Sequence, residues 1–286
     1  SGESFTEEEI YSALREQVAT GDMAPVMMGS GVNAQGANAL MNAIVRYFPS
    51  PERAARDSGV DLTTGEHFVA NYKPDVNLSM KVFKTIADPF IGKYSLVKVL
   101  TGVLRADSEL FNTGKEVEEK SGKIYVLRGK EAIEVSELRP GDIGAMAKLN
   151  ETETGDTLAR KQAPILYNAP QISKPYTYKA YVAKNKGDED RIASGLAKLM
   201  EEDRTLRAEV DAENRQSLLY GIGDQQLDIV VSKLASRYKA EIVLEKPKFA
   251  FRETIRKKVE SAGRYKKQSG GHGQFGDVKM SFEPSG

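Results

Sequence analysis

The sequence predicts a multidomain α+β protein, and three observations carry this prediction. The chain has 286 residues, which is enough for two or three domains of ordinary size. Hydrophobic residues make up 40% of it, which is enough to build cores. The spacing of apolar residues changes along the chain, from a helical period to a period of two near Asn77, and then to strands alternating with helices. A change of pattern of this kind indicates successive domains.

Residues 1–50 are expected to form a helix, a strand and a second helix, as in a piece of an α/β sheet. Thr6 is a candidate N-cap with Glu9 at the capping-box spacing, and apolar residues then recur every four positions. The run APVMMGS, residues 24–30, is short and continuously apolar, which is typical of a buried strand. Helical spacing returns over residues 34–48, and PSPER ends that helix.

Residues 51–75 are expected to be a linker, and residues 76–168 an antiparallel β-barrel. Short β-rich runs follow one another here without a helical run between them. Turn residues divide the runs, for example RPGD at 139–142. This pattern is typical of a small barrel or sandwich, and it ends near Ile165.

Residues 169–248 alternate between strand and helix patterns in the order βαββαβ. Asp188 is a candidate cap for a helix in EDRIASGLAKLMEED, and a second helix is expected in DQQLDIVVSKLASRYK. The expected core positions of the two helices are Ile192, Leu196, Leu199, Leu227, Val231 and Leu234. The order predicts a ferredoxin-like domain.

Residues 249–286 are expected to give a strand, a connection, a strand, a glycine loop and a strand, as the start of a further α/β domain. The segment GHGQFGDV, residues 271–278, matches the glycine loop of kinases and the dinucleotide fingerprint. A fingerprint would need a helix after Gly276, but VKMSF alternates like a strand. A kinase would need catalytic motifs downstream, and only ten residues follow Gly276. The segment is therefore interpreted as a hairpin tip.

Basic residues gather before this tip, although the whole chain carries 41 basic and 41 acidic residues. Only Glu253 and Glu260 oppose them. The basic residues are Lys246, Lys248, Arg252, Arg256, Lys257, Lys258, Arg264, Lys266 and Lys267. Basic strands that lead to a glycine tip suit a polyanion, most simply RNA. A solvated glycine-rich turn is the open alternative.

The composition excludes several other kinds of site. The chain has no cysteine and two histidines, His67 and His272, so disulfides, thiolate chemistry and histidine-based metal sites are not expected. No basic-apolar leader and no apolar run of about 20 residues is present, so we expect a cytoplasmic protein with no membrane or DNA partner.

No catalytic residue is nominated. Tyr176, Tyr178 and Tyr181 are expected to serve core and cross-strand packing, with base stacking as the alternative. The acidic pairs look like solvated charge and not acid–base dyads; they are Glu151/Glu153 and Glu201/Glu202.

Several segments resemble elongation factor G, the translational GTPase that drives ribosomal translocation. RETIRKKVESAGRYKKQSGGHGQFGDV is similar to the start of that family's fourth domain, and GIGDQQLDIVVSKLASRY to a helix of its third. VFKTIADPFIGKYSLVKVLTGVL, LRPGDIGAM and ETETGDTL are similar to its second-domain barrel. APVMMGSGVNAQGANALMNAIVRYFPSP is similar to the end of its GTPase domain. The order of the segments matches the family.

The resemblance implies a fragment: a remnant of a GTPase domain, complete second and third domains and the first strands of a fourth. It implies a tip loop that touches messenger and transfer RNA at the decoding site: Gln268, Ser269, Gly270, Gly271, His272 and Gly273. It also implies that Gly29, Ser30 and Gly31 lie where such GTPases contact guanine. The implied partner is the ribosome, and the chain is expected to be a monomer.

The whole protein is expected to use GTP and Mg²⁺, but this chain to bind neither. The phosphate loop G-x-x-x-x-G-K-[ST] and the other GTP motifs do not occur in a suitable place, so we expect no turnover from the chain itself.

The chain also departs from the family pattern. Gly223-Asp224-Gln225-Gln226-Leu227-Asp228 stands where the family has Gly-Glu-Leu-His-Leu-Glu, Gly31 replaces an alanine, and His272 stands where many members have arginine. A tetracycline-resistance ribosomal protection protein, a non-catalytic ribosome- or RNA-binding module and an inert scaffold stay open as alternatives.

Overall fold

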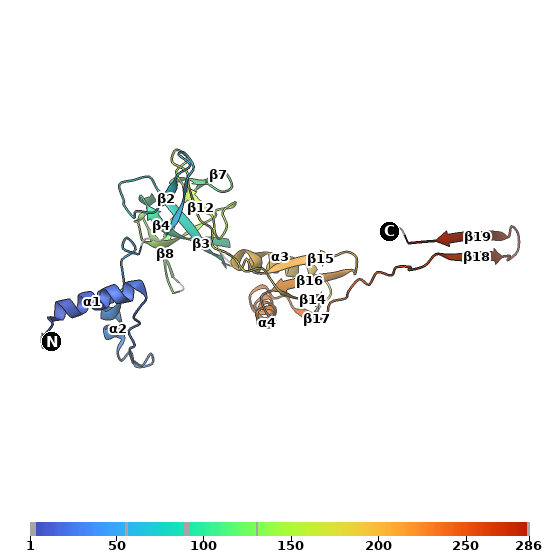
Figure 1. The fold of residues 1–286 in the computed structure, drawn as a ribbon, viewed down its shortest axis with the longest axis horizontal. Coiled ribbons are helices and arrows are strands. Elements are labelled where there is room, and N and C mark those ends of the chain that lie inside the picture. The colour runs from blue at the N-terminus through green and yellow to red at the C-terminus, as the bar shows by residue number, and fades with distance from the viewer. Residues whose placement is uncertain (1–3, 55–56, 89–91, 130, 285–286) are drawn as a thin grey trace.

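The computed structural model describes residues 4–54, 57–88, 92–129 and 131–284. They form an elongated chain of separate units (Figure 1). Two helices lie at the N-terminal end, a β-barrel and a smaller mixed unit follow, and a long hairpin stands alone at the other end. The fold is therefore a multidomain α+β fold with mainly antiparallel sheets, as the sequence predicts. Within the described ranges, no helix has the length and apolar character needed to cross a membrane.

The N-terminal unit contains α1 (Glu7–Thr20) and α2 (Ala37–Tyr47). The predicted capping box is present, because the Thr6 hydroxyl accepts from the Glu9 amide and the Glu9 carboxylate accepts from the Thr6 amide. The helices meet where Arg46 donates to the Tyr11 hydroxyl at 3.1 Å. Neither helix has a buried residue, so their apolar stripes are only partly covered.

The expected strand at residues 24–30 does not form. These residues are coil, and the side chains of Val26 and Met28 are 92% and 95% exposed. Ser30 makes only an isolated bridge with Gln35. A buried strand takes its hydrogen bonds and its cover from neighbouring strands, and the described part of this chain supplies none here.

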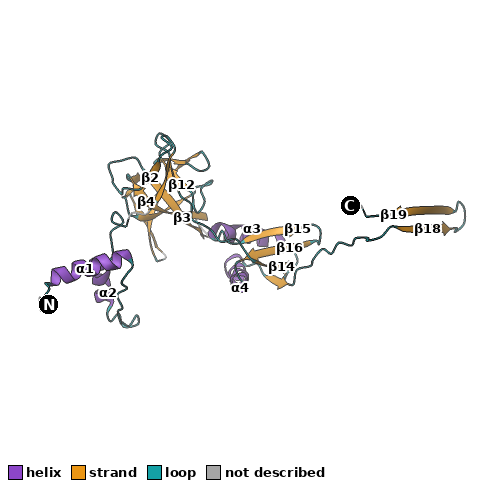
Figure 2. Cartoon of the chain, in the orientation of Figure 1, coloured by secondary structure: helices purple, strands orange, loops and turns teal. Residues whose placement is uncertain are grey.

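The barrel is built on an eight-stranded sheet in which every pairing is antiparallel. Its order is β7-β6-β12-β3-β4-β11-β8-β9, and it curves around one core (Figure 2). The strands are β3 (Ser79–Asp88), β4 (Gly92–Thr101), β6 (Glu109–Asn112), β7 (Val117–Lys120), β8 (Ile124–Arg128), β9 (Glu131–Val135), β11 (Ile143–Ala147) and β12 (Thr157–Ala159).

A short pair, β5 (Leu104–Arg105) and β10 (Glu137–Leu138), adds to the barrel. The core includes Met80, Val97, Leu104, Ile124, Met146 and Leu158. The RPGD turn forms as predicted, with the Asp142 amide donating to the Arg139 carbonyl at 2.9 Å. The sequence prediction of an antiparallel barrel therefore agrees with the structure.

The stretch that was expected to be a linker contains folded structure. β1 (Ser58–Asp61) pairs with β2 (His67–Val69) on one side and with β13 (Ile165–Tyr167) on the other. Ala70 and Tyr72 are buried with Leu100, Ile165 and Tyr167 in a small second core. Residues 58–72 therefore pack on the barrel.

Asp57 fixes this segment to the barrel. Its carboxylate lies 3.1 Å from the Lys98 ammonium and 3.4 Å from that of Lys81, and it accepts from the Tyr72 hydroxyl at 2.9 Å. Burial opposes ionisation of Asp57, but the hydrogen bonds from Lys98 and Tyr72 outweigh it and hold the pKa of the carboxyl below its usual value.

The next unit has the predicted ferredoxin-like topology. Its four-stranded sheet has the order β15-β16-β14-β17, and two helical segments cover one face. The elements are β14 (Thr177–Ala183), α3 (Glu189–Glu202), β15 (Arg207–Asp211), β16 (Gln216–Gly221), α4 (Asp224–Lys233), the π-helical turn η1 (Leu234–Tyr238) and β17 (Ile242–Glu245). We call residues 177–245 the ferredoxin-like unit.

The predicted core of this unit is correct except at Val231, which is only partly buried. Ile192, Leu196, Leu199, Leu227 and Leu234 are buried, and Val230 takes the place expected for Val231. Helix α4 runs into η1, which rotates the last turn relative to a regular 3.6-residue stripe.

Two local predictions need correction here. Asp188 occupies the N-cap position of α3, but its side chain caps no backbone amide, because its carboxylate accepts from Arg191 at 3.0 Å. Tyr178 packs against Tyr220 on the neighbouring strand and Tyr181 packs on the core, as predicted. Tyr176, in contrast, is 75% exposed and packs into no core.

The C-terminal part is a two-stranded hairpin, β18 (Val259–Lys267) and β19 (Gln274–Phe282). Residues 247–256 before it contain no strand, so the first strand expected after Pro247 does not form. Nearly all residues from 249 to 284 are exposed. A hairpin without a covering layer leaves both of its faces open.

Candidate nucleic-acid interface

The hairpin tip is the segment between the last paired residues, Lys267 and Gln274. It comprises the predicted loop, Gln268 to Gly273, and β19 begins directly after it and runs through Gly276 without a break. No helix follows the glycines in the described residues up to 284, so this part of the segment lacks the helix N-terminus that holds a pyrophosphate in a dinucleotide fold.

Two glycines give the tip its shape. Gly270 and Gly271 have φ angles of +58° and +88°, in the left-handed region that side chains with a Cβ rarely adopt. A Cβ added at either position would meet nothing within 4 Å. The constraint is therefore the backbone bend itself and not a lack of space.

Side-chain alternation gives the hairpin two different faces. Cross-strand partners share a face, so Arg264 lies beside Asp277 and Lys266 beside Phe275. The opposite face is mainly apolar and carries Val259, Tyr265, Val278, Met280 and Phe282, each about half exposed, with Lys267 at its loop end. One face therefore carries most of the charge, the other is mainly hydrophobic, and Lys266 and Lys267 lie on opposite faces beside the loop.

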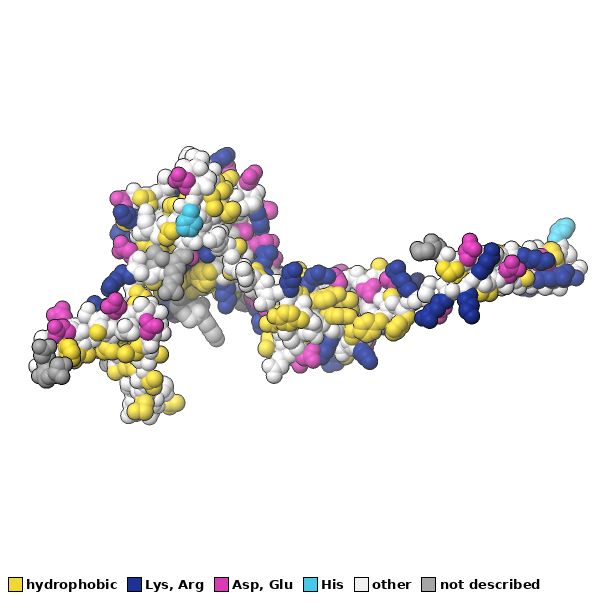
Figure 3. Space-filling model, in the orientation of Figure 1, with side chains coloured by type: hydrophobic (Ala, Val, Ile, Leu, Met, Phe, Trp, Pro, Cys, Tyr) yellow, Lys and Arg dark blue, Asp and Glu magenta, His cyan; other side chains and the backbone are white. Residues whose placement is uncertain are grey.

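The cations of the hairpin are only weakly neutralised. Arg264 lies 4.0 Å from Asp277 with its guanidinium over the Phe275 ring, and Lys258 lies 3.6 Å from Glu283. Lys266 and Lys267, next to the loop, form no ion pair with any residue that the structure describes. Basic side chains line much of the hairpin and the chain that leads to it, which together we call the arm (residues 249–284; Figure 3). Such unpaired ammonium groups are free to meet phosphates.

The second predicted site, Gly29–Ser30–Gly31, lies in a closed loop before α2. The Ser30 amide donates to the Gln35 carbonyl at 3.0 Å, and the Ser30 hydroxyl accepts from the Asn33 amide. A Cβ at Gly29 would meet the Gln35 oxygen at 2.6 Å, whereas Gly31 faces open space. The Ser30 amide and hydroxyl therefore already have partners within the loop.

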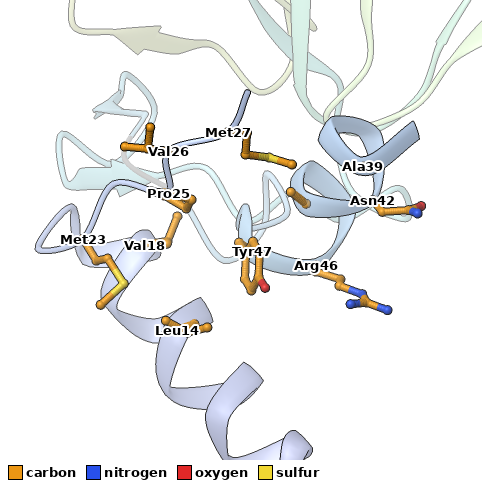
Figure 4. A pocket seen from close by; sticks show the side chains of 11 residues that line it. Leu14, Val18, Met23, Pro25, Val26, Met27, Ala39, Asn42, Arg46 and Tyr47 are labelled. Carbon is orange, nitrogen blue, oxygen red and sulfur yellow. The ribbon is translucent and has the colours of Figure 1, made fainter. Parts of the chain in front are cut away.

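Beside this loop lies an apolar hollow of about 500 Å³ between α1, α2 and residues 23–27 (Figure 4). Leu14, Val18, Met27 and Tyr47 contribute to its walls, and its one charged side chain, Arg46, is engaged by Tyr11. It brings together no set of titratable groups that could carry a reaction.

Comparison with protein families gives three matches in succession along the chain. Residues 77–161 match elongation factor G domain 2, residues 172–246 match elongation factor G domain III, and residues 247–286 match elongation factor G domain IV. The chain belongs to the elongation factor G family.

A solved structure from Thermus thermophilus, of the protein designated ttk003000868, is similar over 99% of this chain, with 30% sequence identity and a TM-score of 0.72. This chain spans 40% of the length of that one.

The described residues do not fit GTP and Mg²⁺, which this family implies. An N-K-x-D tetrapeptide occurs at Asn185–Asp188, but it lies in the ferredoxin-like unit, and the Asp188 carboxylate is engaged by Arg191 and Asn185. No cluster of three acidic, histidine or cysteine side chains that could hold a metal ion occurs in the described part of the chain. No step of GTP chemistry can be derived from these residues.

Gln226, at the position where the elongation factor G pattern has histidine, is satisfied within its own unit. Its side chain accepts from the Ile222 amide at 2.8 Å and donates to Asp203 and Thr205 at 2.8 and 2.7 Å. The departure therefore has a local structural role at the start of α4.

One member of each acidic pair, Glu153 and Glu202, is engaged by other groups and not simply solvated, which corrects the sequence interpretation for these two residues. Glu153 pairs with Lys115 and Arg204, and the hydrogen bond from Arg204 lowers its pKa. Glu202 is held by Arg237 and by the Ala87 amide. Both residues act in contacts between the barrel and the ferredoxin-like unit, which could not be seen from the sequence because their partners are distant in it.

Proposed function

We propose that this chain is a ribosome-binding part of a translational GTPase of the elongation factor G type, and that its hairpin tip contacts RNA. The family matches support the general class. The proposed partners are ribosomal RNA and the tRNA–mRNA at the decoding site, and the proposed location is the cytoplasm. The chain is proposed to act as a monomer.

The single observation that carries the RNA proposal is the structure of the arm. An exposed β-ribbon ends in a bend made by Gly270 and Gly271, and the unpaired Lys266 and Lys267 stand directly beside it. Backbone amides at such a bend and flanking lysines can meet phosphate oxygens without reading base sequence.

No described residue of the chain is proposed to hydrolyse GTP. The proposed role of Gly29, Ser30 and Gly31 is limited to one edge of a guanine site whose phosphate-binding part would come from elsewhere. We expect purified chain to release no phosphate from GTP, and a sustained rate of release above that of a buffer control would contradict this.

The test is sedimentation with ribosomes over a series of salt concentrations. We expect the double variant Lys266→Gln/Lys267→Gln to bind more weakly and with a shallower salt dependence than the native chain, because each lost phosphate contact lowers the slope of log K against log salt by about 0.7 to 0.9. The control variant is Lys84→Gln/Lys174→Gln, which removes the same charge from exposed positions outside the arm. Equal weakening in both variants would show that only total charge matters and would contradict the tip contact.

A further inference from the structure

A groove of about 820 Å³ lies on the ferredoxin-like unit and includes the first residues after β17 in its lining. From these residues the chain leaves the unit toward the hairpin (Figure 1). The groove is bounded by the end of β14, the first turns of α3, the start of β16 and the segment after β17. Tyr181, Val182 and Val210 give it apolar walls. Its basic residues are Lys184, Lys186, Arg215, Lys246 and Lys248.

Most of these cations are not neutralised inside the protein. Lys184 pairs with Glu241, whereas Lys186, Arg215, Lys246 and Lys248 form no ion pair with any described residue. Of the acidic side chains around the groove, only Glu189 and Glu245 line it directly. The groove therefore keeps an excess of positive charge.

The nearby carboxylates of Asp211 and Glu213 have partners outside the groove lysines. Asp211 accepts from the Asn214 side chain at 2.8 Å and from Gln216 at 2.9 Å, and it also accepts from two backbone amides of its own turn. Glu213 lies 3.3 Å from Arg252. Glu213 is thus paired with a cation, whereas Asp211 keeps its negative charge because its donors are neutral amides; neither carboxylate lines the groove.

The position of the exit segment is fixed on the groove. Gln216 accepts from the Lys248 amide and donates to the Lys248 carbonyl, both at 2.8 Å. This two-way contact ties the exit segment to the start of β16, so Lys246 and Lys248 are held against the unit and are not part of a free tail. From here the basic residues continue through Arg256, Lys257 and Lys258 into β18.

We propose that this groove binds the phosphodiester backbone of RNA, as a second contact continuous with the basic arm. The inference rests on the proposed function, because it assigns the same class of partner to a different surface. Lysine and arginine side chains around apolar walls suit a single strand, whose phosphates meet the cations while its bases lie against Tyr181 and Val210, which share one face of the sheet.

The experiment measures binding of the full chain to fluorescein-labelled poly(U) RNA by fluorescence anisotropy at several salt concentrations. The groove variant is Lys186→Gln/Lys248→Gln, which leaves the backbone contact with Gln216 in place. A second groove variant, Arg215→Gln/Lys246→Gln, guards against misfolding of the first. The tip variant Lys266→Gln/Lys267→Gln and the control Lys84→Gln/Lys174→Gln complete the set.

We expect each groove variant to bind poly(U) roughly tenfold more weakly than the control at about 0.1 M salt, with a slope smaller by about 1.4, as the loss of two phosphate contacts requires. Groove variants that bind like the control while the tip variant weakens would overturn the groove proposal and leave the proposed function standing. Absence of poly(U) binding by the native chain would count against both. Groove variants that lose affinity for poly-L-glutamate but not for poly(U) would indicate an acidic protein partner and would likewise overturn the proposal.

Discussion

The guanidinium of Arg237 donates to both carboxylate oxygens of Glu202, at 2.8 and 2.9 Å, and the pair encloses the backbone of Ala87. The Glu202 carboxylate accepts from the Ala87 amide at 2.9 Å, while Arg237 donates to the Ala87 carbonyl at 2.6 Å. Ala87 belongs to β3 of the barrel, and the ion pair belongs to α3 and η1. The two units are therefore joined through main-chain groups, and the pair itself is mostly shielded, with side chains 13% and 29% exposed.

Replacing Arg237 with methionine is expected to lower the free energy of unfolding by roughly 2 kcal/mol, because it leaves the largely buried Glu202 carboxylate without its ion-pair partner and the Ala87 carbonyl without the Arg237 donor. The measurement is urea denaturation followed by circular dichroism. The control is Arg128→Met, which breaks the exposed pair with Glu131 and is expected to change stability by no more than about 0.5 kcal/mol. Equal effects from both changes would contradict the role given to the buried pair.

The contact between the units is expected to weaken in acid. Burial opposes ionisation of Glu202, but the hydrogen bonds from Arg237 and Ala87 outweigh it, and the pKa of Glu202 in the folded protein is lowered. A lowered folded pKa gives stability that is complete above the unfolded pKa, about 4.3, and is lost as the pH falls through the folded pKa. The stability advantage of the native chain over Glu202→Gln should therefore be constant near neutrality and shrink below about pH 4. A stability advantage that grows as the pH falls would show that the pKa of Glu202 is raised in the folded protein and not lowered.

Gly195→Ala is expected to destabilise the ferredoxin-like unit by about 1–3 kcal/mol, although alanine normally favours a helix interior. The new Cβ would lie 2.7 Å from a Leu234 methyl carbon and 3.2 Å from the Tyr238 ring, so α3 and η1 would have to separate. The midpoint of thermal unfolding checks this. Gly263→Ala, where a Cβ would meet nothing within 4 Å, is the control. A higher unfolding midpoint for Gly195→Ala would contradict this expectation, because it would mean that η1 moves aside at little cost in free energy.

Gly271→Ala is expected to loosen the hairpin end without removing the hairpin, because a left-handed backbone costs an L-residue about 1 kcal/mol. Hydrogen exchange of the amides near Lys267 and Gln274 should become about fivefold faster, while exchange near Val259 and Phe282 stays unchanged. Uniformly faster exchange along both strands would instead indicate that the loop nucleates the whole ribbon.

Local sequence signals predicted the elements that depend on neighbours in the chain. The Thr6–Glu9 capping box, the RPGD turn and the βαββαβ order all follow from short-range hydrogen bonding and apolar spacing, and all are present. The failures depend on distant partners. Residues 24–30 carry a strand pattern but have no neighbouring strands among the described residues, and β1 and β2 are too short and too polar to be recognised without β13.

The same distinction between local and distant partners decides which features of the candidate sites could be predicted from the sequence. The glycine bend and the strand after Gly276 could be predicted, since both follow from residues adjacent in sequence. The groove could not, because Lys186, Arg215 and Lys248 are brought together only by the pairing of β14, β16 and β17. Glu202 was misjudged for the same reason, since its partners are Ala87 and Arg237. The RNA contacts of the tip stay predictions until the binding experiments are done.

Because β18 is long, a small rotation at its base moves the glycine bend by a larger distance. Nine residues at about 3.3 Å each make a stiff rod of roughly 30 Å, and the residues before it, 247–256, contain neither helix nor strand. Rotation of such a rod by about 10° about its base carries its far end through about 5 Å, which is more than the length of one strand residue. A small angular adjustment at the exit from the ferredoxin-like unit would thus appear at the glycine bend as a displacement of several ångströms.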